Sequence, residues 1–343
     1  MEDLGLINDN KYKMKISNDK FWKGKRVLVT GGAGFVGSWL SCKLVAKGAR
    51  VTILDIKPKM PNLGEPYDRI FKKSLFVKGD VRDALLLSKL FTRNKFNTVF
   101  HLAAHVLVED VLANPAEALE VNIIGTVRVL EESRKYRNIS VVVASSDKAY
   151  GIHKTLPYKE HFALLGENHP YDCSKSCEDQ IARMYARVYK LPVVVARFGN
   201  IYGGGDYNFS RLIPGTIQAL LNEKPIELRS DGSYRRDCVY IQDVILAYLC
   251  VAENLAQGKI SGEAFNFGHN KPLRVIEMVK MISNLMNKNH LKPIILNNMK
   301  NEIPHQYLDA SKAKNILGWQ PRYEMEEGLR ETIKWYTLFS QRT

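Results

Sequence analysis

Apolar residues recur along this 343-residue chain in two patterns, short dense runs and longer segments with helical spacing. The dense runs are rich in β-branched residues and end at glycine or polar residues, which predicts strands. These strands are Lys25–Thr30, Arg50–Leu54, Ser74–Lys78, Asn97–Leu102, Val141–Ser145, Leu191–Ala196 and Glu263–Phe267. The spaced segments predict helices. They follow Gly37 as far as Gly48 and then cover Asp83–Phe91, Pro115–Tyr136, Tyr171–Tyr189, Ser210–Leu221, Gln242–Asn254, Arg274–Met286 and Met325–Tyr336.

This alternation of strands and helices predicts an α/β fold. Parallel strands joined by helices form a doubly wound, Rossmann-type sheet that is covered on both faces. After residue 200 the pattern is more mixed, which predicts a smaller C-terminal α/β domain that binds substrate. We therefore expect an extension over 1–21, a dinucleotide-binding domain over 22–200 and a substrate-binding domain over 201–343, with some later segments returning to the first domain.

The composition is that of a soluble globular protein, with 45% hydrophobic and 25% charged residues. No apolar run reaches the length of a membrane span. Residues 1–20 lack the apolar core of a signal peptide, so we expect a short mobile extension and a cytoplasmic protein. The net charge of +14 is spread along the chain, which favours an anionic small substrate or simple solubility over nucleic acid.

The five cysteines give no metal-site pattern. Cys173 and Cys177 lie four residues apart in a predicted helix, and no second pair has metal-ligand spacing. His101 and His105 flank the end of the fourth strand without further ligands. We expect free thiols in a reducing compartment and no bound metal.

A glycine-rich turn joins the first strand to the first long helix. Glycines at 31, 34 and 37, with Phe35 and Val36 between them, allow a tight turn and a close approach of the backbone to a pyrophosphate at the helix N-terminus. Asp55 ends the next strand, where a carboxylate accepts hydrogen bonds from a ribose. This pattern predicts NAD rather than NADP, a preference that Lys57 and Lys59 weaken.

Residues after the following strands complete the expected cofactor site. Asp80 and Val81 are expected near the adenine, and Leu102, Ala103 and Ala104 let the backbone pass close to the cofactor. The next long helix carries Asn122. Ordinary packing between helix and sheet accounts equally well for the small residue Ala104.

A tyrosine and a lysine follow the strand that ends in Ser145-Ser146. Tyr171 and Lys175 share one face of a helix, because residues four apart are neighbours on its surface. An ammonium beside a phenol lowers the pKa of the phenol, so Tyr171 could remove a proton from a substrate hydroxyl. The alternative is a surface pair without catalytic meaning.

Together these residues resemble a family. Thr30–Gly37, Asp80, Asn122 with Thr126, Ser146, Tyr171, Lys175 and Asn200 are similar to the extended short-chain dehydrogenase/reductases that act on nucleotide sugars. The resemblance extends from about Trp22 to Pro321. It implies that Tyr171 deprotonates the sugar 4-hydroxyl, that Lys175 holds the nicotinamide ribose, and that Ser146 binds the oxygen at the reacting carbon.

Asp147 and Lys148 distinguish branches of this family. The 4,6-dehydratases place an acid after the serine, followed by Glu or Lys, and this chain has Asp147-Lys148. The resemblance implies that Asp147 protonates the leaving 6-hydroxyl and that Lys148, if neutral, removes the C5 proton or supports that step. Alternatively, Asp147 caps the next segment and Lys148 is solvated, which would favour a 4-epimerase.

Within the family the chain most resembles the CDP-glucose 4,6-dehydratases. The similar stretches are Phe21–Lys25, Gly34–Leu40, Ser146–Lys148, Gly203–Asp206 and Arg211–Pro214. We expect CDP-glucose as substrate and a 4-keto-6-deoxy sugar as product, with GDP-, UDP- and dTDP-linked hexoses left open. Gly32-Ala33 departs from the bulkier polar pair that is frequent in that branch, so the base and the sugar stay open.

Further polar residues are expected to hold the nucleotide sugar: His105, Asn200, Arg211, Arg236 and His305. A guanidinium suits a diphosphate because its donors form a planar fork. Surface ion pairs for the arginines and a structural role for His305 are the alternatives. The helices over 115–136 and 173–189 resemble those through which relatives assemble, so we expect a homodimer or tetramer.

A rival interpretation is a non-catalytic dinucleotide-binding scaffold whose charge binds nucleic acid or a partner. The presence of Ser146, Tyr171 and Lys175 together argues against it.

Overall fold

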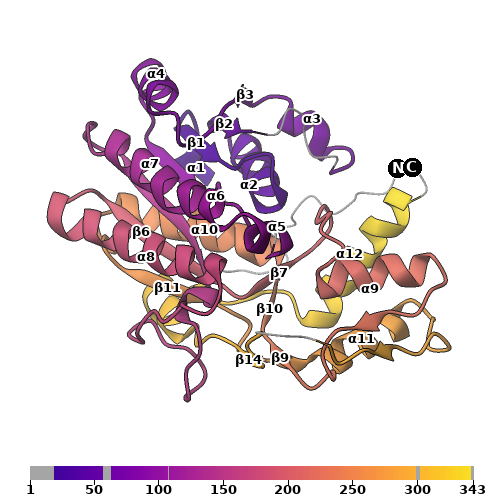
Figure 1. Cartoon of the computed structure of the whole chain (residues 1–343). Coiled ribbons are helices and arrows are strands. Elements are labelled where there is room, and N and C mark those ends of the chain that lie inside the picture. The colour runs from indigo at the N-terminus through magenta and orange to yellow at the C-terminus, as the bar shows by residue number, and fades with distance from the viewer. Residues whose placement is uncertain (1–18, 57–62, 107, 299–301, 341–343) are drawn as a thin grey trace.

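The computed structural model describes residues 19–56, 63–106, 108–298 and 302–340. The predicted extension lies almost wholly outside these residues, and so do Lys57 and Lys59. A large parallel sheet forms the centre of the molecule, and the smaller elements lie to one side of it (Figure 1).

The central sheet has seven strands in the order β11-β6-β5-β4-β1-β2-β3. All neighbouring pairs are parallel. The strands are β1 Arg26–Thr30, β2 Arg50–Asp55, β3 Leu75–Lys78, β4 Thr98–His101, β5 Ser140–Ser146, β6 Val193–Phe198 and β11 Ala264–Phe267. The predicted Rossmann-type α/β fold is therefore confirmed, with each strand within two residues of its expected bounds.

Side chains alternate between the two faces of this sheet. Val142 and Val194 belong to one apolar cluster with helices α2 (Phe35–Ala46) and α10 (Ile241–Ala256). Their neighbours along the same strands point the other way, into a second cluster. That second cluster contains residues of α4 (Ala84–Asn94), α7 (Gly125–Ser133) and α8 (Pro170–Tyr189). Both faces are covered, and the strands inside the edge strand β3 carry buried apolar residues on both sides.

The helix predicted over Pro115–Tyr136 is not one regular helix. It consists of α6 (Pro115–Leu119), a π-helical turn η2 (Glu120–Ile124) and α7, and it ends at Ser133. A π turn inserts one extra residue into the helix, and such turns occur frequently at functional sites. The buried side chain of Asn122 lies within this turn.

The C-terminal part contains three small sheets. β7 (Asn200–Tyr202) pairs with β10 (Cys238–Tyr240). β12 (Leu273–Arg274), β9 (Arg235–Arg236) and β14 (His305–Gln306) form the second sheet. The third pairs β8 (Glu227–Leu228) with β13 (Ile294–Ile295). Arg236 thus lies in a strand of the second small sheet.

Helices α9 (Leu212–Leu221), α11 (Val275–Leu285) and α12 (Met325–Ser340) lie with the small sheets, away from the central sheet (Figure 1). By contrast, two elements that come late in the sequence belong with the central sheet. β11 is one of its strands, and α10 packs against one of its faces. Shorter elements complete the chain: α1 Asp19–Trp22, α3 Tyr67–Phe71, α5 Val108–Ala113, η3 Asp147–Tyr150 and η4 Ala313–Leu317. Within the described ranges, no helix is long and apolar enough to cross a membrane.

Candidate active site

The carboxyl end of β5 turns directly into the short helix η3. Ser146 Oγ caps this turn by accepting a hydrogen bond from Lys148 N at 3.2 Å. The same hydroxyl donates to Asp147 Oδ1 at 3.0 Å. Ser146 therefore provides a capping oxygen for this turn, and the carboxyl group of Asp147 lies beside it, within reach of both Ser146 Oγ and the backbone N–H of Lys148.

Asp147 is buried, with 3% of its surface exposed. Burial raises the pKa of its carboxyl group, against the opposing effects of Lys148, Ser146 and Arg236. A carboxyl group with a raised pKa keeps its proton to higher pH and can act as an acid.

The side chain of Lys148 contacts a distant part of the chain. Its Nζ donates a 2.6 Å hydrogen bond to Oε1 of Gln306, which comes from β14 in the C-terminal part. Asp172 also lies near it, since the charge of Lys148 opposes the burial that raises the pKa of Asp172 to about 6. Lys148 is half-buried and belongs to a polar cluster formed from three elements, while its role as a base stays a prediction.

Helix α8 begins at Pro170 beside this cluster. His169 caps it, its Nδ1 accepting from Tyr171 N at 3.1 Å. Tyr171 therefore lies in the first turn, half-buried. Ser174 Oγ donates to Tyr171 O at 2.7 Å and accepts from Asn122 Nδ2 at 2.8 Å. These bonds fix the start of α8 against the π turn that carries Asn122.

Lys175 lies one turn further along α8, behind Tyr171. Its ammonium donates to Ala144 O at 2.9 Å and to Glu178 Oε2 at 2.8 Å. Burial lowers the pKa of Lys175, but Glu178 and Tyr171 more than compensate and leave it raised. The lysine is therefore held in its charged form at the end of β5.

The expected lowering of the Tyr171 pKa is wrong as a net direction. Burial raises the pKa of the phenol more than Lys175 lowers it, and Glu178 adds to the rise. The sequence pattern identifies the favourable cation, but it gives no information about burial or about the carboxylate that offsets this cation.

The glycine turn fits a dinucleotide. Gly31 has φ +67°, and a Cβ there would lie 2.7 Å from Ala103 N, while a Cβ at Gly37 would lie 2.2 Å from Gly31 O. Gly34 caps α2 without a side chain, and a Cβ there would meet only Gly31 O. Phe35 and Val36 follow in the first turn of α2. The N-terminus of a twelve-residue helix therefore faces outward through a bare backbone, as a pyrophosphate requires.

Acids follow β2 and β3 as predicted. Asp55 Oδ2 accepts from Ala33 N at 2.9 Å, which places this carboxylate beside the glycine turn. Asp80 is paired with Arg82 at 2.7 Å, and the Arg82 hydrogen bonds hold its pKa below the usual range. Val81 is buried against Gly125, at the start of α7.

The segment after β4 passes close to the glycine turn. Leu102 N donates to Thr30 O at 3.1 Å, Ala103 N donates to Thr30 Oγ1 at 3.3 Å, and Ala104 follows. Asn122 Oδ1 accepts from His105 N at 2.7 Å, and its Nδ2 donates to His105 O at 3.2 Å. The side chain of Asn122 thus holds this segment in place, and direct contact of Asn122 with a cofactor stays a prediction.

The expected substrate residues lie around the same edge but are not gathered into one group. Asn200 is exposed at the start of β7 and His305 is exposed on β14. Arg211, at the N-cap of α9, pairs with Asp206 at 2.9 Å. Arg236 is buried, donates to Pro304 O and pairs with Glu302 at 2.7 Å. Both guanidinium groups thus have protein partners here, and their phosphate contacts stay predictions.

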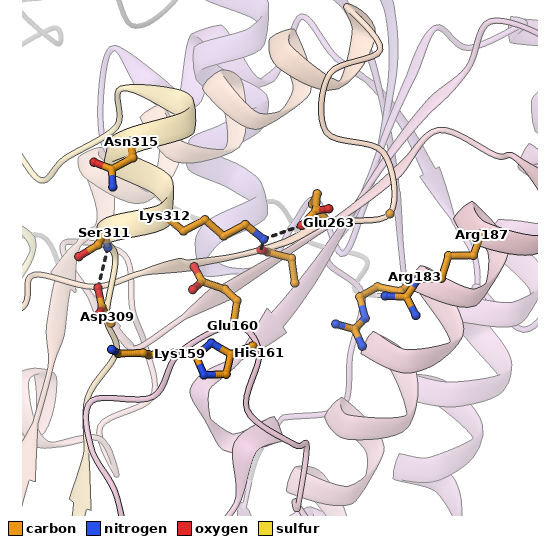
Figure 2. Close-up of a pocket in the computed structure, with 12 residues that line it drawn as sticks. Lys159, Glu160, His161, Arg183, Arg187, Glu263, Asp309, Ser311, Lys312 and Asn315 are labelled. Carbon is orange, nitrogen blue, oxygen red and sulfur yellow. Dashed lines mark hydrogen bonds and ion pairs between the residues drawn. The ribbon is translucent and has the colours of Figure 1, made fainter.

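Two clefts lie outside the catalytic group. One, of about 470 Å³, is lined by charged residues that include Lys159, Arg183 and Arg187 (Figure 2). It reaches Ala264 at the amino end of β11, and Figure 2 shows Lys312 paired with Glu263 there. The amino ends of the parallel strands lie on the side of the sheet opposite to their carboxyl ends. Because the predicted site is at the carboxyl ends of β1 to β5, this cleft is not that site. Another, of about 310 Å³, borders Arg236, Cys238 and His269. Among the described residues, no group of three potential metal ligands occurs.

A family model described as GDP-mannose 4,6 dehydratase matches residues 28–332. The chain belongs to this family. It is 32% identical over 335 residues to CDP-glucose 4,6-dehydratase of Salmonella typhimurium, which covers 92% of this chain and 91% of that protein. It is 31% identical to dTDP-glucose 4,6-dehydratase of Xanthomonas campestris, with 90% and 92% covered. The resemblance to nucleotide-sugar dehydratases is therefore confirmed.

Solved structures agree with this family membership. Epimerase Mth375 of Methanothermobacter thermautotrophicus superposes with a TM-score of 0.87 at 29% identity, covering 96% of this chain and 97% of that one. The dTDP-glucose 4,6-dehydratase of Bacillus anthracis in complex with NAD gives 0.81 at 28% identity, with 93% and 97% covered. The overall fold is thus shared by dehydratases and epimerases, and the side chains of the site must distinguish them.

Sequence reasoning missed three residues of this site: Gln306, Glu178 and Asp172. Glu178 lies three residues after Lys175 on α8, so helical spacing could have identified it. Asp172 directly follows Tyr171 and could have been noticed as a further acid. Gln306 is 158 residues from Lys148, and no periodic pattern connects them.

Proposed function

We propose that this chain is an NAD-dependent nucleotide-sugar 4,6-dehydratase, a hydro-lyase that acts on CDP-glucose. The observation that carries the proposal is the buried Asp147 beside Lys148 in η3, which packs against α8, the helix whose first turn carries Tyr171. One acid and one base in addition to Tyr171 are what water elimination needs after oxidation.

The cofactor residues are the glycine turn, Phe35, Val36, Asp55, Asp80, Val81 and the segment 102–104. The outward-facing N-terminus of α2 receives the pyrophosphate, and Asp55 accepts hydrogen bonds from the adenosine ribose. NAD held by these residues would supply the hydride acceptor for oxidation at C4 and the hydride donor for reduction at C6. The NAD complexes reported for dehydratase neighbours support this assignment.

Oxidation at C4 uses Tyr171, Lys175 and Ser146. Tyr171 takes the proton of the sugar 4-hydroxyl. The Ser146 hydroxyl, which donates to Asp147 Oδ1 in this structure, would turn to donate its one hydrogen bond to the oxygen that becomes the ketone. Lys175 stays charged between Glu178 and Ala144 O, so its positive charge favours the tyrosinate. In the complex, the ammonium would also bind the nicotinamide ribose.

Elimination follows because a ketone at C4 makes the C5 proton acidic. Neutral Lys148 takes that proton, while Asp147 gives its proton to the leaving 6-hydroxyl, which departs as water. Lys148 then returns a proton to C5, and the proton taken by Tyr171 restores Asp147. The balance is one water lost and one ketone gained, with no net oxidation of the nucleotide sugar.

The nucleotide diphosphate would lie between the end of the central sheet and the C-terminal part. Arg236, Arg211 and Asn200 are the proposed phosphate contacts, with His105 and His305 near the sugar or base. Arg236 also borders the 310 Å³ cleft. The choice of CDP-glucose rests on the sequence similarity to a CDP-glucose enzyme, while relatives named for dTDP-glucose and UDP-glucose give the alternatives.

A 4-epimerase is the second candidate, because epimerases are among the most similar solved structures. Asp147 and Lys148 distinguish the two functions, because only a dehydratase needs an acid and a base for water elimination. An epimerase needs no acid for a leaving hydroxyl, whereas here a buried carboxyl group with a raised pKa lies at that position.

The test is a panel of CDP-, dTDP-, UDP- and GDP-hexoses incubated separately with the purified protein. The proposal predicts loss of one water from the sugar nucleotide, seen by mass spectrometry, and alkaline absorbance of a 4-keto sugar, strongest with CDP-glucose. An isomer of unchanged mass would instead establish an epimerase. If none of the four substrates gives a product, the interpretation as a non-catalytic dinucleotide-binding scaffold remains.

We also propose a homodimer or tetramer assembled through α8 and the helices before it. Val188 and Tyr189 are 61% and 50% exposed on α8, and Ile124 in η2 is 44% exposed. These apolar side chains lie on the helices that were expected to form the interface. Sedimentation equilibrium of the purified chain tests this.

A further inference from the structure

Gln306 brings a side chain from β14 into the cluster at the end of β5. Its Oε1 accepts the 2.6 Å hydrogen bond from Lys148 Nζ, across 158 residues of sequence. Only 1% of its surface is exposed. β14 places Gln306 in register with Arg236 on β9, and Gln306 O accepts from Asp237 N at 3.3 Å. The backbone that carries this amide is therefore fixed by the small sheet.

The orientation of this amide has a chemical consequence. The amide presents its oxygen to Lys148, where it can accept from the ammonium or from an N–H of the neutral amine, and its nitrogen lies on the other side of the amide group. That nitrogen, Nε2, is buried and has no acceptor within the described residues. Buried amide groups are almost always paired. A donor left unpaired beside the proposed sugar site is therefore suited to an oxygen of a bound nucleotide sugar.

We propose that Gln306 is a positioning residue for water elimination, holding Lys148 at C5 of the sugar through Oε1 and binding an oxygen of the nucleotide sugar through Nε2. The inference rests on the proposed dehydratase function and deepens it. When Lys148 takes the C5 proton, Oε1 accepts a hydrogen bond from the ammonium that forms. The proton passes from C5 to the amine, the C5 electron pair expels the 6-hydroxyl, and Asp147 protonates the leaving oxygen.

The neutral amide matters because Lys148 must lose its proton before it can act as a base. A carboxylate in place of the amide would form a buried ion pair and favour the charged lysine. The other groups that face Lys148 are Asp147 on η3, Asp172 on α8 and His169 at the start of α8. They are unchanged in a Gln306 variant, so Gln306→Glu isolates the added charge at constant size.

The experiment compares two steps of the reaction on the NAD-loaded protein. Single-turnover absorbance of reduced nicotinamide follows C4 oxidation, and quenched product analysis follows elimination with ordinary and C5-deuterated CDP-glucose. For Gln306→Met we expect oxidation at nearly the wild-type rate. We expect elimination to slow about 10- to 100-fold, the usual loss for a hydrogen bond to a charged group, with a larger deuterium isotope effect at C5.

Gln306→Glu provides the second measurement. In this variant the acid limb of the pH profile for elimination should move to higher pH than in the wild-type protein. The pH profile of oxidation should stay in place. Gln242→Met is the matched control, because Gln242 is also a buried glutamine but lies in α10. This control should leave the ratio of the two rates unchanged.

Two outcomes would overturn the role of Gln306. One is an equal loss of rate in oxidation and elimination. The other is an unchanged isotope effect in Gln306→Met together with an unchanged pH profile in Gln306→Glu. The wild-type arm separates this outcome from failure of the proposed function. If the wild-type protein eliminates water from no nucleotide sugar, the dehydratase proposal itself fails, and the inference fails with it.

Discussion

Lys175 Nζ and Glu178 Oε2 lie 2.8 Å apart, and their side chains are only 5% and 1% exposed. This buried ion pair lies directly behind Tyr171, on the same helix. Burial raises the pKa of Glu178 to about 7, and Lys175 acts against that rise. The second oxygen, Oε1, has no hydrogen-bond partner within the described residues. The carboxylate thus offsets part of the positive charge that Tyr171 would otherwise experience.

Glu178→Gln should therefore make Tyr171 more acidic. Glu178 contributes to the raised pKa of the phenol, so removing its charge lowers that pKa. We expect the acid limb of C4 oxidation to move to lower pH. The pH dependence of single-turnover nicotinamide reduction measures this. Glu132→Gln, at a buried carboxylate of α7, is the control. A profile that stays in place, with only a lower rate, would assign Glu178 a purely structural role.

Tyr171→Phe should abolish oxidation while leaving the fold intact, because only the phenolic oxygen is lost. We expect nicotinamide reduction to slow by about 10²- to 10⁴-fold, the usual contribution of a positioned proton acceptor. Tyr189→Phe, at an exposed position on the same helix, should match the wild-type rate. Turnover of Tyr171→Phe within a few-fold of wild type would mean that another group is the base.

Asp147→Asn should separate oxidation from elimination. The amide keeps the size of the side chain but cannot donate a proton as an acid, so the 6-hydroxyl cannot leave as water. We expect reduced nicotinamide to accumulate in a single turnover, with product formation slowed about 10²-fold or more. Asp231→Asn, at an exposed turn, is the control. Product formation at the wild-type rate by Asp147→Asn would show that the carboxyl group is not the acid.

His101 should make the stability of the fold depend on pH. It is fully buried between Thr30 Oγ1 at 2.8 Å and Thr126 Oγ1 at 2.9 Å. Burial, with the charge of Lys175, lowers the pKa of His101 to about 3, below the value of 6.5 for the free side chain. The unfolded chain therefore binds the additional proton between these pH values. The contribution of His101 to the free energy of unfolding is present above pH 6.5 and is lost as the pH falls, by up to about 1.4 kcal/mol per pH unit.

Urea unfolding between pH 4 and pH 7 tests this on the wild-type protein and His101→Gln. The glutamine variant should show a shallower loss of stability on acidification, whatever its absolute stability. Buried carboxyl groups such as Asp237 titrate in both proteins, so their effect cancels in the comparison. Parallel curves would mean that His101 has the same pKa in the folded and the unfolded protein.

The central sheet and the position of Tyr171 and Lys175 on one helix were predictable because their signals are local. Val27–Val29 followed by Gly31 to Gly37 specifies a strand, a turn and a helix, and Tyr171 with Lys175 shares one helical face. The contact of Gln306 with Lys148 was not predictable, because it depends on how two distant segments pack. The π turn at Asn122 also depends on packing rather than on helical propensity.

Burial accounts for the remaining difference between prediction and structure. The sequence pattern identifies Lys175 as a cation beside Tyr171, but the net pKa of Tyr171 follows from burial and from Glu178. Similarly, Asp147 could have been a turn cap, and only the structure shows that Ser146 provides a capping oxygen.

The most direct test of the central claim uses CDP-glucose deuterated at C4. A 4,6-dehydratase oxidises C4 and returns the same hydrogen to C6, so the product should be a 4-keto-6-deoxy sugar nucleotide that carries the deuterium at C6. Mass spectrometry and proton NMR of the product locate the label. Deuterium retained at C4 of an isomer of unchanged mass would contradict the account and establish an epimerase instead.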